Sequence, residues 1–197
     1  DMSLAFESID LPPAAAELRQ RVRAFLSAQR EAGAFVPSCS GWTLFDRNFT
    51  RACGQAGLIG LTWPKRWGGQ ERSTLERYVV VEELLAAGAP VGGHWIADRQ
   101  SGPQIMRHGS AALQELVLPG IVKGEVTCAI GMSEPSSGSD LASVRSRGEK
   151  VDGGWRLQGR KIWTTGGHHA DYMIGLFRTD PPDTSKRHAG LTQFAID

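Results

Sequence analysis

Two segments of this sequence combine hydroxyl groups, glycines and aromatic residues in patterns specific enough to indicate chemistry. Residues 130–140 read IGMSEPSSGSD, and residues 161–170, about 30 positions later, read KIWTTGGHHA. Both lie in a stretch where apolar residues alternate as they do in strands. Hydroxyl groups donate hydrogen bonds, and glycine lets a backbone approach a ligand closely. These segments are therefore the first candidates for a binding site.

Common catalytic signatures are missing from the sequence. It contains no G-x-G-x-x-G after a strand and no G-x-x-x-x-G-K-[ST], which excludes Rossmann-type dinucleotide binding and P-loop chemistry. Residues 131–135 approach a nucleophile elbow, but Pro135 stands where the second glycine is required. His168 and His169 are adjacent, so they cannot share a helix face as zinc-binding histidines do, and we interpret them as loop residues. No metal site is expected.

Together, in this order and at this spacing, the two segments closely resemble the paired signatures of the acyl-CoA dehydrogenase family. Residues 56–69 (AGLIGLTWPKRWGG) and 118–131 extend the resemblance over the rest of the chain. It implies flavin-dependent α,β-dehydrogenation of an acyl-CoA thioester, in which a carboxylate removes an α-proton and a β-hydride passes to N5 of FAD. Hydrogen bonds to the thioester carbonyl make that proton acidic. An electron-transfer flavoprotein or another acceptor then reoxidises the FAD.

The resemblance also implies roles for individual residues. Ser133 stands where the family has a hydroxyl that donates to the flavin ring, and Ser139 can donate to a pyrophosphate oxygen. Trp163 resembles the aromatic residue packed against the ring, with Thr165 on the same strand face. Packing in a β-core is the alternative for Trp163, and turn capping is the alternative for Ser133. The implied cofactor-binding residues are Ile130, Met132, Ser133, Gly138, Ser139, Trp163 and Thr165.

Neither acidic residue of the first segment is expected to be a catalytic base. We interpret Glu134 and Asp140 as carboxylates that stabilise the loop. By resemblance, the helix around residues 93–103 (GHWIADRQSGP) lies beside the acyl chain of the substrate. Trp95 and Arg99 on this helix predict a bulky, ring-containing or carboxylated acyl group. Together with Ser139 they are the predicted substrate contacts.

Composition limits the other classes of function. Hydrophobic residues make up 41% of the chain and charged residues 22%, and the formal net charge is +1, so no nucleic acid partner is expected. No apolar run approaches the ~20 residues that span a bilayer, and no signal peptide is recognisable, so no membrane partner is expected. Cys39, Cys53 and Cys128 fit neither a disulfide framework nor a zinc site, which favours reduced thiols in a cytoplasmic protein.

The periodicity of apolar residues changes near residue 125. Before it, helical patterns cover residues 12–33, 45–57, 73–85, 94–108 and 110–118, and Ser73 with Glu76 forms a capping box. After it, strand patterns cover residues 126–132, 172–178 and 191–196, with a hairpin within 143–165. The sequence therefore predicts an α+β protein. An all-α domain (1–125) precedes an antiparallel, β-barrel-like middle domain (126–197) that is incomplete at its C-terminus.

The resemblance implies a C-terminal four-helix bundle that carries the catalytic glutamate, so we expect the base outside this chain and assign no catalytic residue within it. Either the chain is then part of a longer polypeptide, or a separate polypeptide completes the site. We also expect a homo- or hetero-oligomer, dimeric or tetrameric. Two alternatives share these motifs. One is an acyl-CoA oxidase or flavin monooxygenase on the same scaffold, and the other is a non-catalytic subunit of a heteromeric dehydrogenase.

Overall fold

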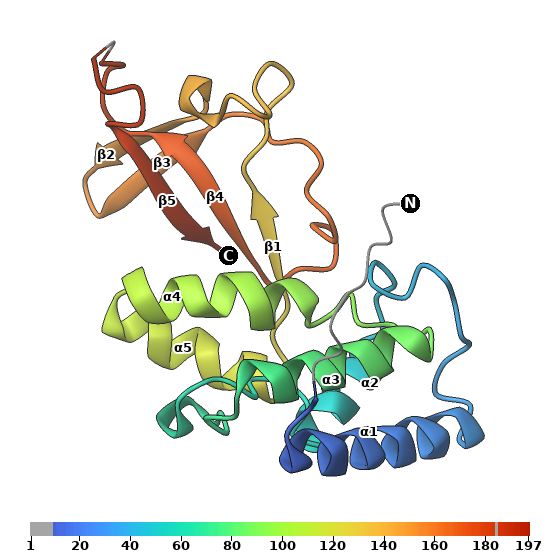
Figure 1. Cartoon of the computed structure of the whole chain (residues 1–197). Helices are drawn as coiled ribbons and strands as arrows, with labels where there is room; N and C mark the ends of the chain where they lie inside the picture. The colour runs from blue at the N-terminus through green and yellow to red at the C-terminus, as the bar shows by residue number, and fades with distance from the viewer. Residues whose placement is uncertain (1–9, 184) are drawn as a thin grey trace, which may run out of the picture.

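A computed structural model describes residues 10–183 and 185–197 and shows a helical part followed by a five-stranded sheet (Figure 1). The sheet lies above the helical part in this view, with β1 and β4 reaching down to it. The helices are α1 (Pro13–Glu31), α2 (Arg47–Gln55), η1 (Lys65–Trp67), α3 (Thr74–Ala86), η2 (Ala97–Ser101), α4 (Gly102–His108), α5 (Ala111–Val122) and η3 (Leu141–Ser143). The strands are β1 (Cys128–Gly131), β2 (Arg147–Val151), β3 (Gly154–Gln158), β4 (Tyr172–Arg178) and β5 (Leu191–Ile196).

The helical part forms because apolar residues recur on one face of each long helix. In α1, Leu18, Val22 and Leu26 are buried at helical spacing. In α3, the predicted capping box is confirmed: the Ser73 hydroxyl accepts the Glu76 amide, and the Glu76 carboxylate accepts the Ser73 amide. The two helices pack together, and the buried core continues from them into β1 and β4.

The connection between α2 and η1 contains Trp63, which packs in the core of the helical part. Trp63 is only 2% exposed, and its indole N–H donates to the carbonyl of Asp98 at 3.2 Å. The Asp98 carboxylate accepts the Gly60 amide at 2.9 Å. A side chain at Gly102 would collide with the Trp63 ring. Trp63 therefore fixes the position of η2 and the start of α4.

The helix predicted for residues 94–108 is not regular. Ala97–Ser101 forms a π-helix, and an α-helix follows only from Gly102. Single π-turns inside helices are rare and occur often at functional sites. The contact between Gly102 and Trp63 accompanies this change of pitch.

The sheet is mixed, which corrects the predicted antiparallel arrangement. β4 pairs with β1 in parallel and with β5 antiparallel, and the β2–β3 hairpin joins β4 through the pair Arg147 and Arg178. β1 and β4 are parallel because the intervening hairpin makes the chain cross over and return in the same direction. Among the described residues the strands do not close into a barrel.

The predicted hairpin of residues 143–165 is also shorter than expected. Strand β3 ends at Gln158, which pairs with Arg147, the first residue of β2. Trp163 has a φ of 57°, in the left-handed region that strands do not use. Trp163 and Thr165 therefore do not lie on one strand face. They belong to an irregular connection that leads to β4.

Other expectations concern cysteines, metals and membranes. Cys39, Cys53 and Cys128 are all free thiols, the last two buried. Over residues 10–183 and 185–197, no group of three or more metal-ligating side chains gathers in one place. Over the same residues, no helix combines the length and apolar character needed to cross a membrane.

Candidate functional site

The two segments singled out from the sequence lie side by side. The Ile162 amide donates to the Ser133 carbonyl at 2.9 Å. The Lys161 ammonium donates to the Met132 carbonyl at 3.2 Å and to the Glu134 carboxylate at 2.8 Å. These contacts hold the start of the second segment against the end of β1. Because Ile162 directly precedes Trp163, they place Trp163 near Ser133.

Glu134 is buried at the centre of this contact. Its carboxylate accepts the Arg145 amide at 2.7 Å and the Ser146 amide at 2.9 Å, besides the Lys161 ammonium. Although burial opposes ionisation, Lys161 and the Ser146 and Arg145 donors lower the pKa of Glu134 to about 2. A carboxylate so fully engaged is a poor base, so the loop-stabilising interpretation of Glu134 is confirmed.

Asp140 has the same kind of role at the surface. It accepts a hydrogen bond from the Ser143 hydroxyl and pairs with the Arg187 guanidinium at 2.9 Å. The Ser143 hydroxyl and, in smaller part, Arg187 lower the pKa of Asp140. Its contacts hold the loop before η3, as expected from the sequence.

Trp163 is displayed to solvent. Its side chain is 86% exposed, so the alternative of packing in a β-core is wrong. A bulky residue in the left-handed region costs on the order of 1 kcal/mol or more and persists only where the surroundings impose it. An indole held in this conformation and left uncovered is available to stack on a planar ligand.

The hydroxyl and glycine positions fit a ligand-binding loop. Ser133 is half-buried, and its hydroxyl makes no hydrogen bond with any described residue, so the turn-capping alternative finds no support. Gly138 and Ser139 are exposed, and a side chain added at Gly138 would meet no atom within 4 Å. Packing does not require glycine there, and the space beside it is open to a ligand. Ile130 and Met132 are half-buried at the end of β1.

Sequence reasoning missed Ser137 in this loop. Its hydroxyl is buried, with the residue 4% exposed, and has no hydrogen-bond partner among the described residues. A buried hydroxyl without a hydrogen-bond partner is uncommon in folded proteins. Apart from its place inside the motif, nothing in the sequence distinguished Ser137 from Ser136.

A small cavity joins the second segment to the helical part. Trp95 and Thr165 both line it, so the structure brings a predicted substrate residue and a predicted flavin residue together. Its walls are mostly aromatic and apolar, and no carboxylate is among them. The lining residues are Trp42, Thr43, Phe45, Gly92, Trp95, Ile96, Thr127, Cys128, Thr165, Gly166, His169 and Ala170.

Trp42 and Phe45 are wall residues that sequence reasoning did not identify. Phe45 was assigned to a helical stripe, but α2 begins only at Arg47, because Asp46 caps it by accepting the Phe49 amide. Phe45 therefore precedes the helix, and its ring stacks on His169 at a centroid distance of 4.2 Å. His168 and His169 are loop residues, as predicted.

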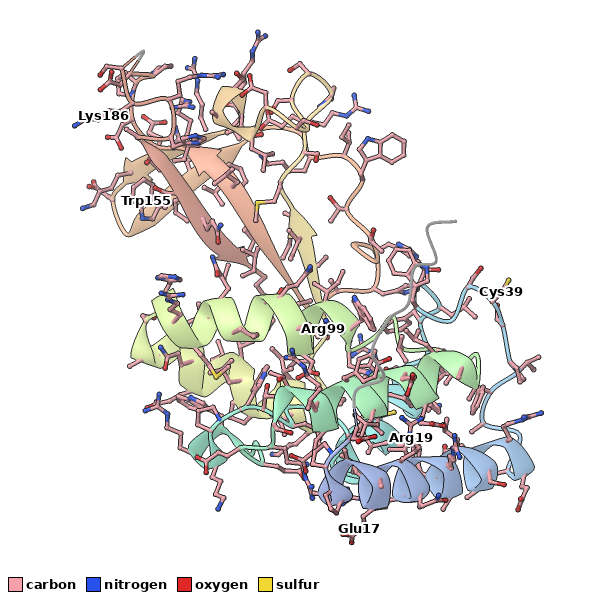
Figure 2. All side chains as sticks on the ribbon, in the orientation of Figure 1. Glu17, Arg19, Cys39, Arg99, Trp155 and Lys186 are labelled. Atoms are coloured by element: carbon pink, nitrogen blue, oxygen red, sulfur yellow. The ribbon has the colours of Figure 1, made fainter. Side chains whose placement is uncertain are left out.

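Arg99 points to the other side of Trp95. Its guanidinium carbon lies 4.6 Å from the centre of the Trp95 ring, a cation–π contact. Arg99 lines a second small cavity with Trp95, His94 and residues of α3, and Figure 2 shows it between that helix and α4. Burial lowers the pKa of His94 to about 4, so this histidine is neutral. A role for Arg99 in substrate binding stays a prediction.

An all-α domain followed by a mixed sheet, with the two candidate loops at the end of β1 and before β4, defines the class of protein. The chain matches the acyl-CoA dehydrogenase N-terminal domain over residues 12–125 and the acyl-CoA dehydrogenase middle domain over residues 129–197. It therefore belongs to the acyl-CoA dehydrogenase family.

Individual relatives agree with this assignment. "Acyl-CoA dehydrogenase FadE26" of Mycobacterium tuberculosis is 32% identical over 95% of this chain and 48% of its own length. Isovaleryl-CoA dehydrogenase of Oryza sativa is 37% identical over 77% of this chain and 37% of its own. The solved structure "Tcur3481-Tcur3483 steroid ACAD" is 32% identical with a TM-score of 0.80, covering 96% of this chain and 49% of that chain. The chain thus spans about half the length of these relatives, or less.

Proposed function

We propose that this chain forms the flavin-binding loops and one wall of the acyl site of an FAD-dependent acyl-CoA dehydrogenase. The observation that carries the proposal is the exposed, left-handed Trp163 beside Ser133, held there by the Ile162–Ser133 hydrogen bond. An uncovered indole can stack on a planar ring, and the nearby Ser133 hydroxyl can donate to acceptors on the edge of that ring. The exposed glycine loop leaves room for a pyrophosphate. FAD has that chemistry and, when bound, supplies the hydride acceptor.

Different residues of the chain would contact different parts of FAD. Ser133 and Thr165 would donate hydrogen bonds to the ring edge, and Trp163 would cover part of its face. Gly138 would let the loop backbone approach the pyrophosphate, and Ser139 would donate to a phosphate oxygen. Ile130 and Met132 present the end of β1 to the same place.

The proton of the reaction would be taken by a group outside the described residues. No carboxylate lines the cavity that Trp95 and Thr165 share. Glu134 is engaged by its amide and ammonium donors, and Asp171 by the Arg47 guanidinium. This chain therefore positions the cofactor and substrate, while another part of the protein or a partner subunit supplies the base.

For the substrate, we propose a bulky, ring-containing acyl group. Trp42, Phe45 and Trp95 give the cavity flat aromatic walls that favour contact with rings over a flexible chain. A similar solved structure is named a steroid acyl-CoA dehydrogenase, which supports the same class. Reduced FAD would pass its electrons to an electron-transfer flavoprotein or a similar acceptor.

A heteromeric assembly is the second candidate. Two similar structures are named as pairs of chains, "Tcur3481-Tcur3483" and the "ChsE4-ChsE5 complex" of Mycobacterium tuberculosis, the latter with 29% identity and a TM-score of 0.80. In such an assembly this chain could belong to the subunit that lacks the base. Oxidase or monooxygenase activity on the same scaffold is distinguished by rapid reoxidation of the reduced protein in air.

The test is anaerobic titration of the full-length protein. We expect the purified protein to be yellow, and its visible flavin absorbance to bleach on addition of a ring-containing acyl-CoA but far more slowly with butyryl-CoA. A protein that takes up no FAD, or is not bleached by any acyl-CoA even with a co-expressed partner chain, would contradict the proposal.

A further inference from the structure

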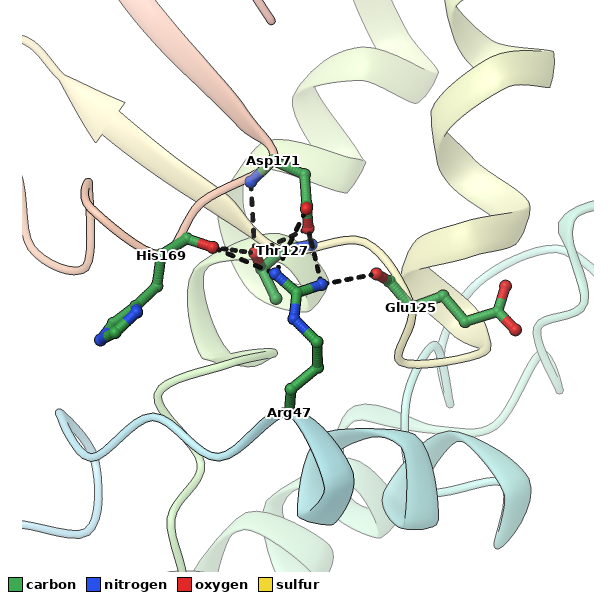
Figure 3. A network of polar contacts seen from close by, with 5 residues as sticks. All are labelled: Arg47, Glu125, Thr127, His169 and Asp171. Carbon is green, nitrogen blue, oxygen red and sulfur yellow. Dashed lines mark hydrogen bonds and ion pairs between the residues drawn. The ribbon is translucent and has the colours of Figure 1, made fainter.

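Arg47 of the helical part forms hydrogen bonds with the end of the second binding segment and with Asp171, which follows it. Figure 3 shows Arg47 at the start of α2, with its guanidinium among acceptors from two other parts of the chain, one at Glu125 and one at His169 and Asp171. It donates to the carbonyls of Glu125 at 3.2 Å and His169 at 3.4 Å, and to both carboxylate oxygens of Asp171 at 3.3 Å. We call Arg47, Glu125, Thr127, His169 and Asp171 the Arg47 network.

Asp171 and Thr127 connect the network to the sheet. The Asp171 carboxylate accepts the Thr127 amide at 2.7 Å, and the Thr127 hydroxyl lies 2.9 Å from it and 3.0 Å from the His169 carbonyl. Thr127 directly precedes β1 and Asp171 directly precedes β4. The network therefore ties α2 to the starts of the two paired strands that bear the binding segments.

Charge keeps the network intact at neutral pH. Although burial opposes ionisation, the Thr127 amide, the Arg47 guanidinium and the Thr127 hydroxyl lower the pKa of Asp171. Thr127 is 3% exposed, so its donors have little access to water as an alternative partner. Hydrogen bonds between charged partners are stronger than neutral ones, and a planar guanidinium can serve several acceptors at once.

An aromatic stack adds a second tie from the same stretch of chain. The ring of Phe45 lies parallel to that of His169, with an interplanar angle of 8°, and the Arg47 guanidinium lies 5.6 Å from the centre of the Phe45 ring. His169 is thus held through its carbonyl by Arg47 and through its ring by Phe45. The turn of residues 165–169 ends at this point.

The segment that carries Trp163 and Thr165 is therefore anchored at two ends. One end is the Ile162–Ser133 hydrogen bond beside β1, and the other is His169 in the Arg47 network. Between these anchors, Trp163 is 86% exposed and makes few contacts of its own. Its position relative to Ser133 depends on where the two anchors hold the segment.

We propose that Arg47, with Phe45, is a positioning residue for the flavin-binding segment, so that the helical part sets how Trp163 and Thr165 meet the cofactor. This inference rests on the proposed function. Arg47 itself does not line the cavity that Trp95 and Thr165 share. It acts through His169 and Asp171, and a displacement of about 1 Å at a reacting centre can slow a reaction by up to about a hundredfold.

The first experiment compares Arg47→Gln with Arg51→Gln in the full-length, FAD-loaded protein. Arg51 is exposed one turn later on the same helix and is the matched control. For Arg47→Gln we expect a shifted flavin spectrum and flavin reduction by acyl-CoA slowed on the order of tenfold, with acyl-CoA affinity changed less than about twofold. Loss of thermal stability alone, with the spectrum and reduction rate of the control, would overturn the inference.

A second experiment does not depend on flavin. Amide hydrogen exchange at Gly167, His169 and Ala170, measured on the protein without FAD, should be faster in Arg47→Gln than in Arg51→Gln. Equal exchange in both variants would overturn the inference. If Arg47→Gln does not fold, Phe45→Leu replaces it, because this change removes the stack but keeps the ion pair. If the wild-type protein binds no FAD, the proposed function fails, and exchange alone decides whether Arg47 positions the segment.

Discussion

At the scale of single residues, the most informative is Trp163, because it combines a left-handed backbone with an uncovered indole. If this indole stacks on FAD, Trp163→Ala in the full-length protein should weaken FAD binding several-fold, since such stacking contributes on the order of 1 kcal/mol. The change should also shift the visible flavin spectrum. FAD retained through gel filtration and the absorption spectrum measure both effects, and unchanged values would remove Trp163 from the site.

Glu134 gives a prediction about stability and pH. Glu134→Gln leaves the Lys161 ammonium, whose side chain is 7% exposed, without its buried counter-charge. We expect the full-length protein to lose about 3 kcal/mol of unfolding free energy at pH 7, as measured by urea denaturation. The exposed Asp140–Arg187 pair provides the control, and Asp140→Asn should change stability much less.

The pH dependence of that difference follows from the pKa of Glu134. Its folded value of about 2 lies below the value of about 4.3 in an unfolded chain. The carboxylate therefore stabilises the fold fully above pH ~4.3, and this contribution is lost as the pH falls towards 2. The gap between wild type and Glu134→Gln should be constant from pH 7 to 5 and shrink below that. A gap that stays constant down to pH 3 would contradict the assigned ionisation.

At the scale of elements, α3 matters because it packs on α1 and lines the cavity on the far side of Trp95. Ser73→Ala removes the hydroxyl that accepts the Glu76 amide, so the unfolding free energy should fall by about 1 kcal/mol. Ser73→Gly should lower the unfolding free energy by only a few tenths of ~1 kcal/mol, because glycine leaves the helix end open to water. Urea denaturation of the two variants measures the contrast, and equal losses would argue against a capping role.

At the scale of the whole molecule, the proposal that the catalytic base lies outside these residues can be tested directly. Because no carboxylate lines the cavity shared by Trp95 and Thr165, residues 1–197 produced alone and mixed with FAD should show no bleaching with any acyl-CoA. The full-length protein, or this chain with its partner subunit, should show it. Bleaching of the isolated residues 1–197 at an enzymatic rate would mean that they contain a base.

Local sequence patterns were sufficient wherever a feature depends on neighbouring residues. The capping box of Ser73 and Glu76 follows from two residues three positions apart, and the change from helix to strand near residue 125 follows from apolar periodicity. The two candidate binding segments and the family were also recognisable, because their residue types occur in order along the chain.

Only the tertiary structure decided features that join distant residues. Arg47 and Asp171 are 124 positions apart, and no local pattern relates them. The parallel pairing of β1 and β4 depends on the path of the chain between them, and no local pattern predicts the positive φ of Trp163. The sequence by itself thus determined the family and the two segments that we expect to bind the cofactor. Long-range packing, which periodicity does not encode, decided how those segments meet and which residues hold them there.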